Sequence, residues 1–202
     1  MSQAHWDSIY AAKTPDQLSW TQEDPATSLR FLQAANLPSG ARVLDAGAGL
    51  GTLAHALLQA TDWHVTLADL SAEALAKAKA RLGDSPRLTF LQGDVRALPV
   101  ATASLDAWHD RAVLHFLREP ADRAAYAATV ARALKPGGVA VIAGFAPDGP
   151  EKCSGLDVCR ADAADLAAVL GAEFTLEAQA REVHLTPWGK EQAFQYTRFR
   201  RR

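Results

Sequence analysis

A glycine-rich stretch, Val-Leu-Asp-Ala-Gly-Ala-Gly-Leu-Gly-Thr at residues 43–52, carries the clearest chemical signal in the chain. Gly47, Gly49 and Gly51 stand at alternate positions, after an apolar segment and before a helical pattern. Glycine lacks a Cβ atom, so backbone N–H groups in such a turn can approach a ligand closely. The stretch therefore predicts a nucleotide-binding turn.

Two residues of this stretch distinguish between nucleotides. The dinucleotide fingerprint is G-x-G-x-x-G/A, and Thr52 occupies its last position here. Asp45 ends the expected strand just before the turn, where it would face a pyrophosphate, and like charges at short range repel. A cationic ligand without phosphate, such as S-adenosylmethionine (SAM), fits this carboxylate better. A dinucleotide-dependent dehydrogenase is therefore the least favoured interpretation.

Further acids end the next two expected strands. Asp69 follows the apolar run 63–68, and an acid at this distance from a glycine turn can accept hydrogen bonds from ribose hydroxyls. Asp94 follows the run 88–92, where it could accept from an adenine amino group while the Val95 N–H donates to the ring. Acids at the ends of three successive strands together predict a cofactor that contains adenosine.

These residues resemble the class I SAM-dependent methyltransferases. Residues 45–51 are similar to motif I of that family, Asp69 to its ribose-binding acid, Gly93-Asp94-Val95 to its adenine motif, and residues 134–139 to the turn into its fifth strand. The resemblance covers roughly residues 40–145. It implies SAM as cofactor, S-adenosylhomocysteine as product and no metal. It also implies a cofactor site made of Trp20, Asp45, Gly47, Ala48, Gly49, Asp69, Leu70, Asp94, Val95 and Asp110.

The N-terminal flank resembles a small bacterial subgroup with a His-Trp-Asp…Ser-Trp-Tyr-Gln signature. This chain has His5-Trp6-Asp7 and Ser19-Trp20-Thr21-Gln22, so Thr21 replaces the tyrosine. In the resembling family such a segment folds over the cofactor, and we expect residues 1–37 to form lid helices. Trp6 and Trp20 can alternatively be packing anchors for this segment.

The remaining elements predict how these residues are positioned. Apolar runs alternate with helical patterns, which favours a parallel, doubly wound sheet whose ligands bind outside the carboxyl ends of the strands. The expected strands are 41–46, 63–68, 88–92, 104–109 and 139–145, and the expected helices are 51–60, 71–82 and 121–134. Asp45, Asp69 and Asp94 all fall at the predicted ligand-binding edge.

The last third changes character. Residues 146–159 read as an irregular loop, 161–170 as a helix ending at Gly171, and 173–185 and 192–200 as strands joined by a short turn that favours antiparallel pairing. We therefore predict a Rossmann-like, seven-stranded, mostly parallel sheet with a C-terminal antiparallel hairpin and helices on both faces. The 202 residues form one domain, with a SAM-binding core at 38–146 and a substrate side at 147–202.

Methyl transfer from SAM is a direct displacement that requires no unique catalytic signature. Alignment alone can supply roughly 7–11 kcal/mol of barrier reduction, and a base is needed only for an acceptor that is protonated. The strand-end rule places several candidates near the methyl group. They are Asp110, His115 and His184 for proton removal, and Arg111, Cys153 and Trp188 for substrate binding.

Each candidate also has a structural interpretation. Asp110 and Arg111, expected to open a helical stretch after the fourth strand, could form a cap or a local ion pair. His115 lies among apolar residues and could belong to the core, while His184 could simply end a strand. Cys153 could be an inert loop thiol. Neither the cysteines nor the histidines show a metal-ligand spacing.

Composition excludes several classes of function. The net charge of −2 gives no basic footprint for nucleic acid, and no apolar run is long enough for a membrane helix. Two cysteines late in the chain indicate reduced thiols and a cytoplasmic location. We expect a monomer or weak homodimer that methylates a small-molecule thiol or amine. A protein-lysine methyltransferase and a non-catalytic SAM-binding protein are the alternatives.

Overall fold

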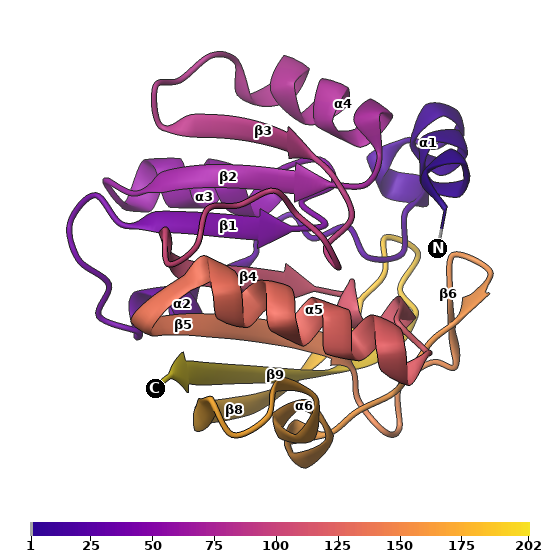
Figure 1. The fold of residues 1–202 in the computed structure, drawn as a ribbon. Coiled ribbons are helices and arrows are strands. Elements are labelled where there is room, and N and C mark those ends of the chain that lie inside the picture. Colours follow the sequence, from indigo (N-terminus) through magenta and orange to yellow (C-terminus); the bar gives the residue numbers. More distant parts are fainter. Residues whose placement is uncertain (1) are drawn as a thin grey trace.

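A computed structural model describes residues 2–202, in which a seven-stranded sheet has the order β3-β2-β1-β4-β5-β9-β8 (Figure 1). Strands β1 to β5 pair in parallel, and β9 lies antiparallel between β5 and β8. The strands are β1 (Arg42–Ala46), β2 (His64–Asp69), β3 (Leu88–Gln92), β4 (Leu105–Arg111), β5 (Leu134–Phe145), β8 (Phe174–Leu185) and β9 (Glu191–Arg201). The predicted fold class is confirmed, and the strand order reverses between β1 and β4.

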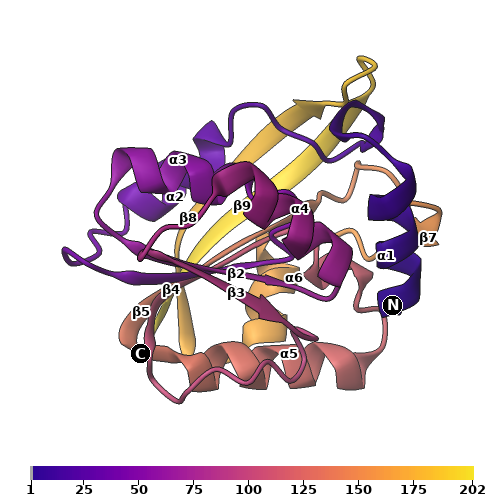
Figure 2. The same cartoon turned by 90° about the horizontal axis from the view of Figure 1, so that it is seen from above.

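Helices cover both faces of the sheet (Figure 2). One face carries α2 (Ala26–Gln33), α3 (Thr52–Ala60) and α4 (Ala72–Leu82), with α1 (Gln3–Ala12) beside α4. The other face carries α5 (Pro120–Ala133) and α6 (Ala163–Leu170). Ser71 caps α4 as expected, since its hydroxyl accepts from the Ala74 N–H at 3.1 Å.

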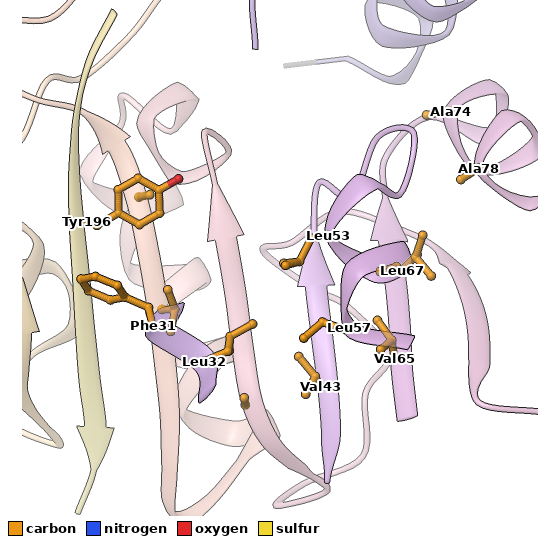
Figure 3. Packing of buried hydrophobic residues seen from close by; sticks show 14 of the residues in the cluster. Phe31, Leu32, Val43, Leu53, Leu57, Val65, Leu67, Ala74, Ala78 and Tyr196 are labelled. Carbon is orange, nitrogen blue, oxygen red and sulfur yellow. The ribbon is translucent and has the colours of Figure 1, made fainter. Parts of the chain in front are cut away.

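The core forms because apolar side chains alternate across buried parallel strands. Val43 and Leu44 are neighbours on β1 and belong to separate apolar clusters on opposite faces of the sheet, as the period of two requires. Leu53 and Leu57 of α3 pack over the face that contains Val43 (Figure 3). The sheet thus holds its carboxyl edge rigidly between two helical layers.

The structure corrects several boundaries. Strand β5 begins at Leu134 rather than at Val139, directly after α5 ends. Strand β4 continues through Arg111, because it pairs with β5 as far as Ala143, and the expected helical stretch is the short helix η2 (Leu114–Phe116) beyond it. The loop at 146–159 contains a small hairpin of β6 (Lys152–Cys153) and β7 (Leu156–Asp157). Helix α6 begins at Ala163, because the Asp162 carboxylate accepts the N–H groups of the first turn.

The segment predicted to form lid helices, residues 1–37, is described from residue 2 on and contains two helices of different placement. Helix α1, the turn η1 (Pro15–Gln17) and the loop that follows precede the sheet-covering layer. Helix α2 belongs to that layer, since Phe31 and Leu32 are buried in the main apolar cluster. Within residues 2–202, no helix has the length and apolar character that crossing a membrane requires.

We predict that Leu44→Ala lowers the free energy of unfolding by about 2–5 kcal/mol, because Leu44 is fully buried in the central strand and its removal leaves a cavity. Leu185→Ala is the matched control, since Leu185 on β8 is 59% exposed and its loss should change stability by less than about 0.5 kcal/mol. Guanidinium denaturation followed by tryptophan fluorescence measures both. Equal losses in the two variants would contradict the assigned core.

Candidate active site

The glycine turn runs from the end of β1 into α3 in a left-handed backbone conformation. The φ angles of Gly47, Gly49 and Gly51 are 65°, 53° and 72°. The Gly47 and Ala48 N–H groups donate to the Ala68 carbonyl at 2.7 and 3.1 Å. These two N–H groups therefore have hydrogen-bond acceptors within the protein. The glycines allow the left-handed backbone conformation and the close approach of neighbouring side chains to the turn. A Cβ added to Gly47 would lie 2.1 Å from Val113 Cγ2.

A cavity of about 70 Å³, here called the inner cavity, lies over this turn at the carboxyl ends of the strands. This volume is below the roughly 300–1,000 Å³ typical of small-ligand pockets, so the chemistry of the lining residues, rather than the free volume, identifies the site. The lining residues are Trp6, Tyr10, Trp20, Gly47, Asp69, Leu70, Gly93, Asp94, Val95, Arg111, Ala112, Val113, Phe116 and Cys153. The structure thus brings together most of the predicted cofactor residues.

Asp69 is held at the wall of the inner cavity by two backbone donors. Its Oδ2 accepts from the Gly49 N–H and its Oδ1 from the Ser71 N–H, both at 2.9 Å. Burial raises the pKa of this carboxyl to about 6, although both hydrogen bonds oppose the rise. Each carboxylate oxygen can accept more than one hydrogen bond, so both can still accept from ligand hydroxyls.

Asp94 occupies the next position along the wall. Its carboxylate receives hydrogen bonds from Arg96 Nε at 2.9 and 3.1 Å, and these contacts lower the pKa of Asp94. Arg96 also pairs with Asp122 at 2.6 Å, so it is held between two acids. Asp94 therefore stays ionised at neutral pH and can accept a hydrogen bond.

Aromatic side chains of the N-terminal segment close the inner cavity. Trp6 packs edge-on against Phe116 and Trp20, with ring centroids 5.1 and 5.9 Å apart. Tyr10 lies over the glycine turn, since a Cβ on Gly49 would be 2.8 Å from its hydroxyl. Trp6 and Trp20 are thus both packing residues and cavity walls. Tyr10 was missed by sequence analysis, although it stands one helical turn from Trp6.

A larger, more open hollow, here called the outer groove, lies between residues 13–25, the start of α3 and the β8–β9 turn. Asp45, Ala48, Gly49, His109 and His184 are among its lining residues. Three residues, Trp20, Gly47 and Arg111, line both the inner cavity and the outer groove. We call their meeting point the neck.

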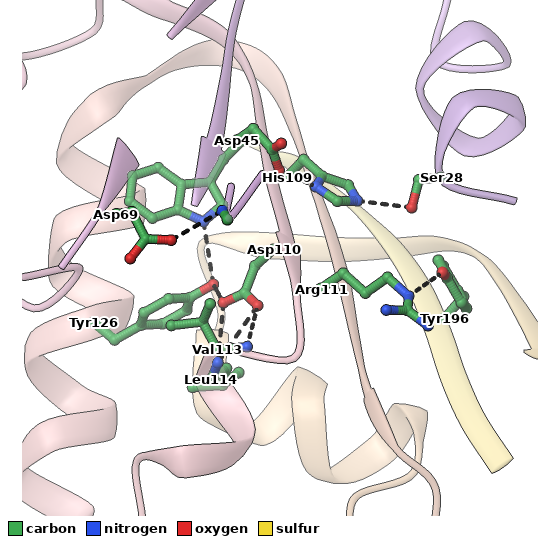
Figure 4. A network of polar contacts seen from close by, with 12 residues as sticks. Ser28, Asp45, Asp69, His109, Asp110, Arg111, Val113, Leu114, Tyr126 and Tyr196 are labelled. Atoms are coloured by element: carbon green, nitrogen blue, oxygen red, sulfur yellow. Dashed lines mark hydrogen bonds and ion pairs between the residues drawn. The ribbon is translucent and has the colours of Figure 1, made fainter. Parts of the chain in front are cut away.

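Asp45 takes part in a buried polar chain at the groove (Figure 4). Its Oδ1 lies 2.7 Å from His109 Nδ1, and His109 Nε2 lies 2.9 Å from Ser28 Oγ. A carboxylate can only accept, so Nδ1 carries a proton, and Nε2 shares a hydrogen bond with the Ser28 hydroxyl. Asp45 thus points toward β4 rather than into the inner cavity. His109 and Ser28 were not predicted as site residues.

Arg111 crosses the neck. Its Nε donates to the Tyr196 hydroxyl and its Nη1 to the Trp20 carbonyl, both at 3.0 Å (Figure 4). The guanidinium carbon lies 4.2 Å from the centroid of the Phe194 ring. Arg111, a predicted substrate-binding residue, therefore lines both hollows, and Tyr196 is an unpredicted partner.

Asp110 occupies a different environment from the one expected. Its fully buried carboxylate accepts from the Val113 and Leu114 N–H groups and from the Tyr126 hydroxyl at 2.8 Å. Burial raises its pKa to about 6. Asp110 caps the segment after β4 and lines neither the inner cavity nor the outer groove. The structural interpretation, a cap, describes this residue.

The two predicted histidines lie apart. His115 is buried beside a hollow between α5 and α6, away from the inner cavity, and burial lowers its pKa to about 3. His184 lines the outer groove, where its Nε2 donates to the Ser19 carbonyl at 2.8 Å. Burial, followed by the charge of Arg111, lowers the pKa of His184. Of these two histidines, only His184 lines the outer groove, and its lowered pKa favours the neutral imidazole at neutral pH.

The other two substrate candidates also differ in position. Cys153 lines the inner cavity, but burial raises its pKa to about 11, so it remains a neutral thiol. Trp188 is 57% exposed in the β8–β9 turn and lines neither the inner cavity nor the outer groove. Among residues 2–202, no cluster of potential metal ligands is found.

Comparison with known proteins shows the family to which the chain belongs. The sequence profile of the family described as "Methyltransferase domain" matches residues 43–138. The 27-O-demethylrifamycin SV methyltransferase of Amycolatopsis mediterranei is 32% identical over 195 residues, which are 91% of this chain and 68% of that protein. Dimethylglycine N-methyltransferase of Parasynechococcus marenigrum is 32% identical over 148 residues, which are 71% of this chain. The chain spans only 25–51% of the length of that protein and two other curated relatives.

Solved structures show the same fold. The 1,6-didemethyltoxoflavin-N1-methyltransferase of Burkholderia thailandensis, with S-adenosylhomocysteine bound, superposes with a TM-score of 0.75 at 26% identity, covering 98% of this chain and 88% of that one. A protein from echinomycin biosynthesis gives a TM-score of 0.79 at 21% identity, over 98% of this chain and 92% of that one. Because the rifamycin methyltransferase aligns along nearly the whole chain and the fold agrees, this chain belongs to the class I SAM-dependent methyltransferases.

Proposed function

We propose that the protein transfers the methyl group of SAM to a small-molecule nucleophile by direct displacement. The observation that carries this proposal is the meeting of Asp69 and Asp94 with the glycine turn at one enclosed cavity. When bound, SAM supplies an electrophilic methyl group on a sulfonium. The residues of the chain bind the cofactor, orient the acceptor and exclude water.

The residues that line the inner cavity offer the chemical groups that such a cofactor needs. Asp69 has acceptor capacity left for ribose hydroxyls, and Asp94 and the Val95 backbone can hold an adenine edge. Leu70 and Val95 supply apolar wall at the same end, while Trp6, Tyr10 and Trp20 close the cavity from the N-terminal segment. Exclusion of water strengthens the hydrogen bonds made inside.

The enclosed site favours a small acceptor. The relatives named above act, by their names, on a demethylrifamycin, on dimethylglycine and on a didemethyltoxoflavin. A protein-lysine methyltransferase would need an acidic or aromatic entry channel, for which Asp110 and Trp20 are the candidates, but Asp110 lies outside both hollows. A thiol or amine that enters through the outer groove would meet the methyl group at the neck, with His184 of the groove lining as a candidate proton acceptor.

Calorimetric titration with S-adenosylhomocysteine, with NAD as the comparison, tests the cofactor assignment. We expect micromolar binding of S-adenosylhomocysteine alone. A screen of small thiols and amines for S-adenosylhomocysteine formation from SAM then tests transfer. Binding without turnover on the whole panel would favour a non-catalytic SAM-binding protein, and absence of binding would remove the proposal.

We predict that Asp69→Asn weakens S-adenosylhomocysteine binding tenfold or more, because charge-assisted hydrogen bonds are worth about 1.5–3 kcal/mol. Protonation of Asp69 should also weaken wild-type binding as the pH falls below about 6, and the variant should lose this dependence. Asp62→Asn is the control, since Asp62 also accepts a backbone N–H, from Gly40, but lies away from both hollows. Equal affinity in all three proteins would show that Asp69 does not contact the ligand.

We predict that His184 titrates below its ordinary pKa of about 6.5 and that Arg111→Met raises this pKa, since burial and the Arg111 charge both oppose protonation. NMR titration of the imidazole ring protons measures the shift. Because the folded-state pKa is the lower one, the free energy of unfolding should fall as the pH drops below about 6.5. A midpoint above 6.5 would contradict the assigned surroundings of His184.

A further inference from the structure

Arg111 is a cation without a carboxylate partner at the neck. Its hydrogen bonds go to neutral oxygens, those of Tyr196 and Trp20, and its Nη2 is buried with no hydrogen-bond partner. Within residues 2–202, no acidic group forms an ion pair with it. Two N–H groups on Nη2 and one on Nη1 therefore stay available.

The groups that face Arg111 do not supply the missing negative charge. Cys153 and Tyr196 have raised pKa values and stay neutral at pH 7, and His184 is unprotonated. Glu182 on β8, whose charge acts on both His184 and Tyr196, accepts instead from the Gln22 side chain at 3.1 Å. A guanidinium cannot lose its proton, and withdrawing it from water is costly unless an anion compensates.

The position of Arg111 shows where that anion would come from. Arg111 lines both the inner cavity and the outer groove, so a ligand in either hollow can reach it. Tyr196 fixes Nε and the Phe194 ring supports one guanidinium face, which holds the fork in a single orientation. A fixed guanidinium fork matches the geometry of a carboxylate.

We propose that Arg111, positioned by Tyr196, is an oxyanion-binding subsite that receives a ligand carboxylate at the neck. Two sources share this chemistry: the amino-acid carboxylate of the cofactor, and a carboxylate on the methyl acceptor. The inference rests on the proposed function, because both ligands belong to the same site. It adds that one of them is anchored by its negative charge.

The test compares Arg111→Met with Arg118→Met, a control whose arginine is exposed, pairs with Asp157 at 3.3 Å and lines neither hollow. Calorimetry measures the affinities of S-adenosylhomocysteine and of 5′-methylthioadenosine, which lacks the amino-acid carboxylate. Tryptophan fluorescence then measures the binding of benzoate, and of its neutral analogue benzamide, to the complex of the protein with S-adenosylhomocysteine.

If the cofactor carboxylate is the ligand, Arg111→Met weakens S-adenosylhomocysteine tenfold or more and leaves 5′-methylthioadenosine unchanged. If the acceptor is the source, S-adenosylhomocysteine is unaffected, benzoate binds the wild-type complex more tightly than benzamide, and the variant loses that preference. Arg118→Met should match the wild type in every titration. Either of the first two patterns supports the subsite and identifies its ligand.

The subsite is overturned if Arg111→Met binds all probes like the wild type, or if it weakens both adenosine ligands equally. Thermal unfolding checks that each variant is folded. If Arg111→Met does not fold, Arg111→Lys replaces it in the test. This variant keeps the positive charge but not the guanidinium fork, so we expect a smaller loss of affinity for the same ligand. Failure of the wild type to bind either adenosine ligand is a separate result, which would remove the proposed function and this inference with it.

Discussion

The hydrogen bonds from two backbone N–H groups to Asp69 are the constraint on which the site depends. They join the glycine turn, through Gly49, to the end of β2 and to the start of α4, through Ser71. The Ser71 hydroxyl also donates to Asp7 of α1 at 2.6 Å. The carboxylate that faces the cavity, the turn beneath it and the helix that covers it are therefore held as one unit.

This arrangement also brings charged side chains to the inner cavity. Asp69 and Asp94 contribute negative charge to the lining of the inner cavity, and Arg111 contributes positive charge, while Trp6 and Phe116 are among its apolar lining residues. Partly buried charges are screened less than exposed ones. Charges of both signs therefore act on a ligand in the inner cavity.

Sequence analysis identified what is encoded locally. A strand, the acid that ends it and the glycine turn after it lie within a few residues of one another, and the strand-end rule then places Asp69 and Asp94 together. Contacts between residues far apart in the sequence depend on the order of the strands in the sheet, and no local sequence pattern predicts that order. His109 meets Asp45 across 64 residues and Arg111 meets Tyr196 across 85, because β1 and β9 become neighbours of β4 and β5.

The different positions of Asp110 and Arg111 follow from where β4 ends. In a helical turn, neighbouring residues can share a site, but in a strand they point to opposite faces. Because β4 continues through Arg111, His109 and Arg111 face the outer groove, while Trp108 and Asp110 face α5 and both contact Tyr126. The polar side chains on one face of β4 thus support the fold, and those on its other face line the outer groove. The sequence placed the end of this strand two residues too early, which grouped Asp110 with Arg111 although the two side chains point to opposite faces.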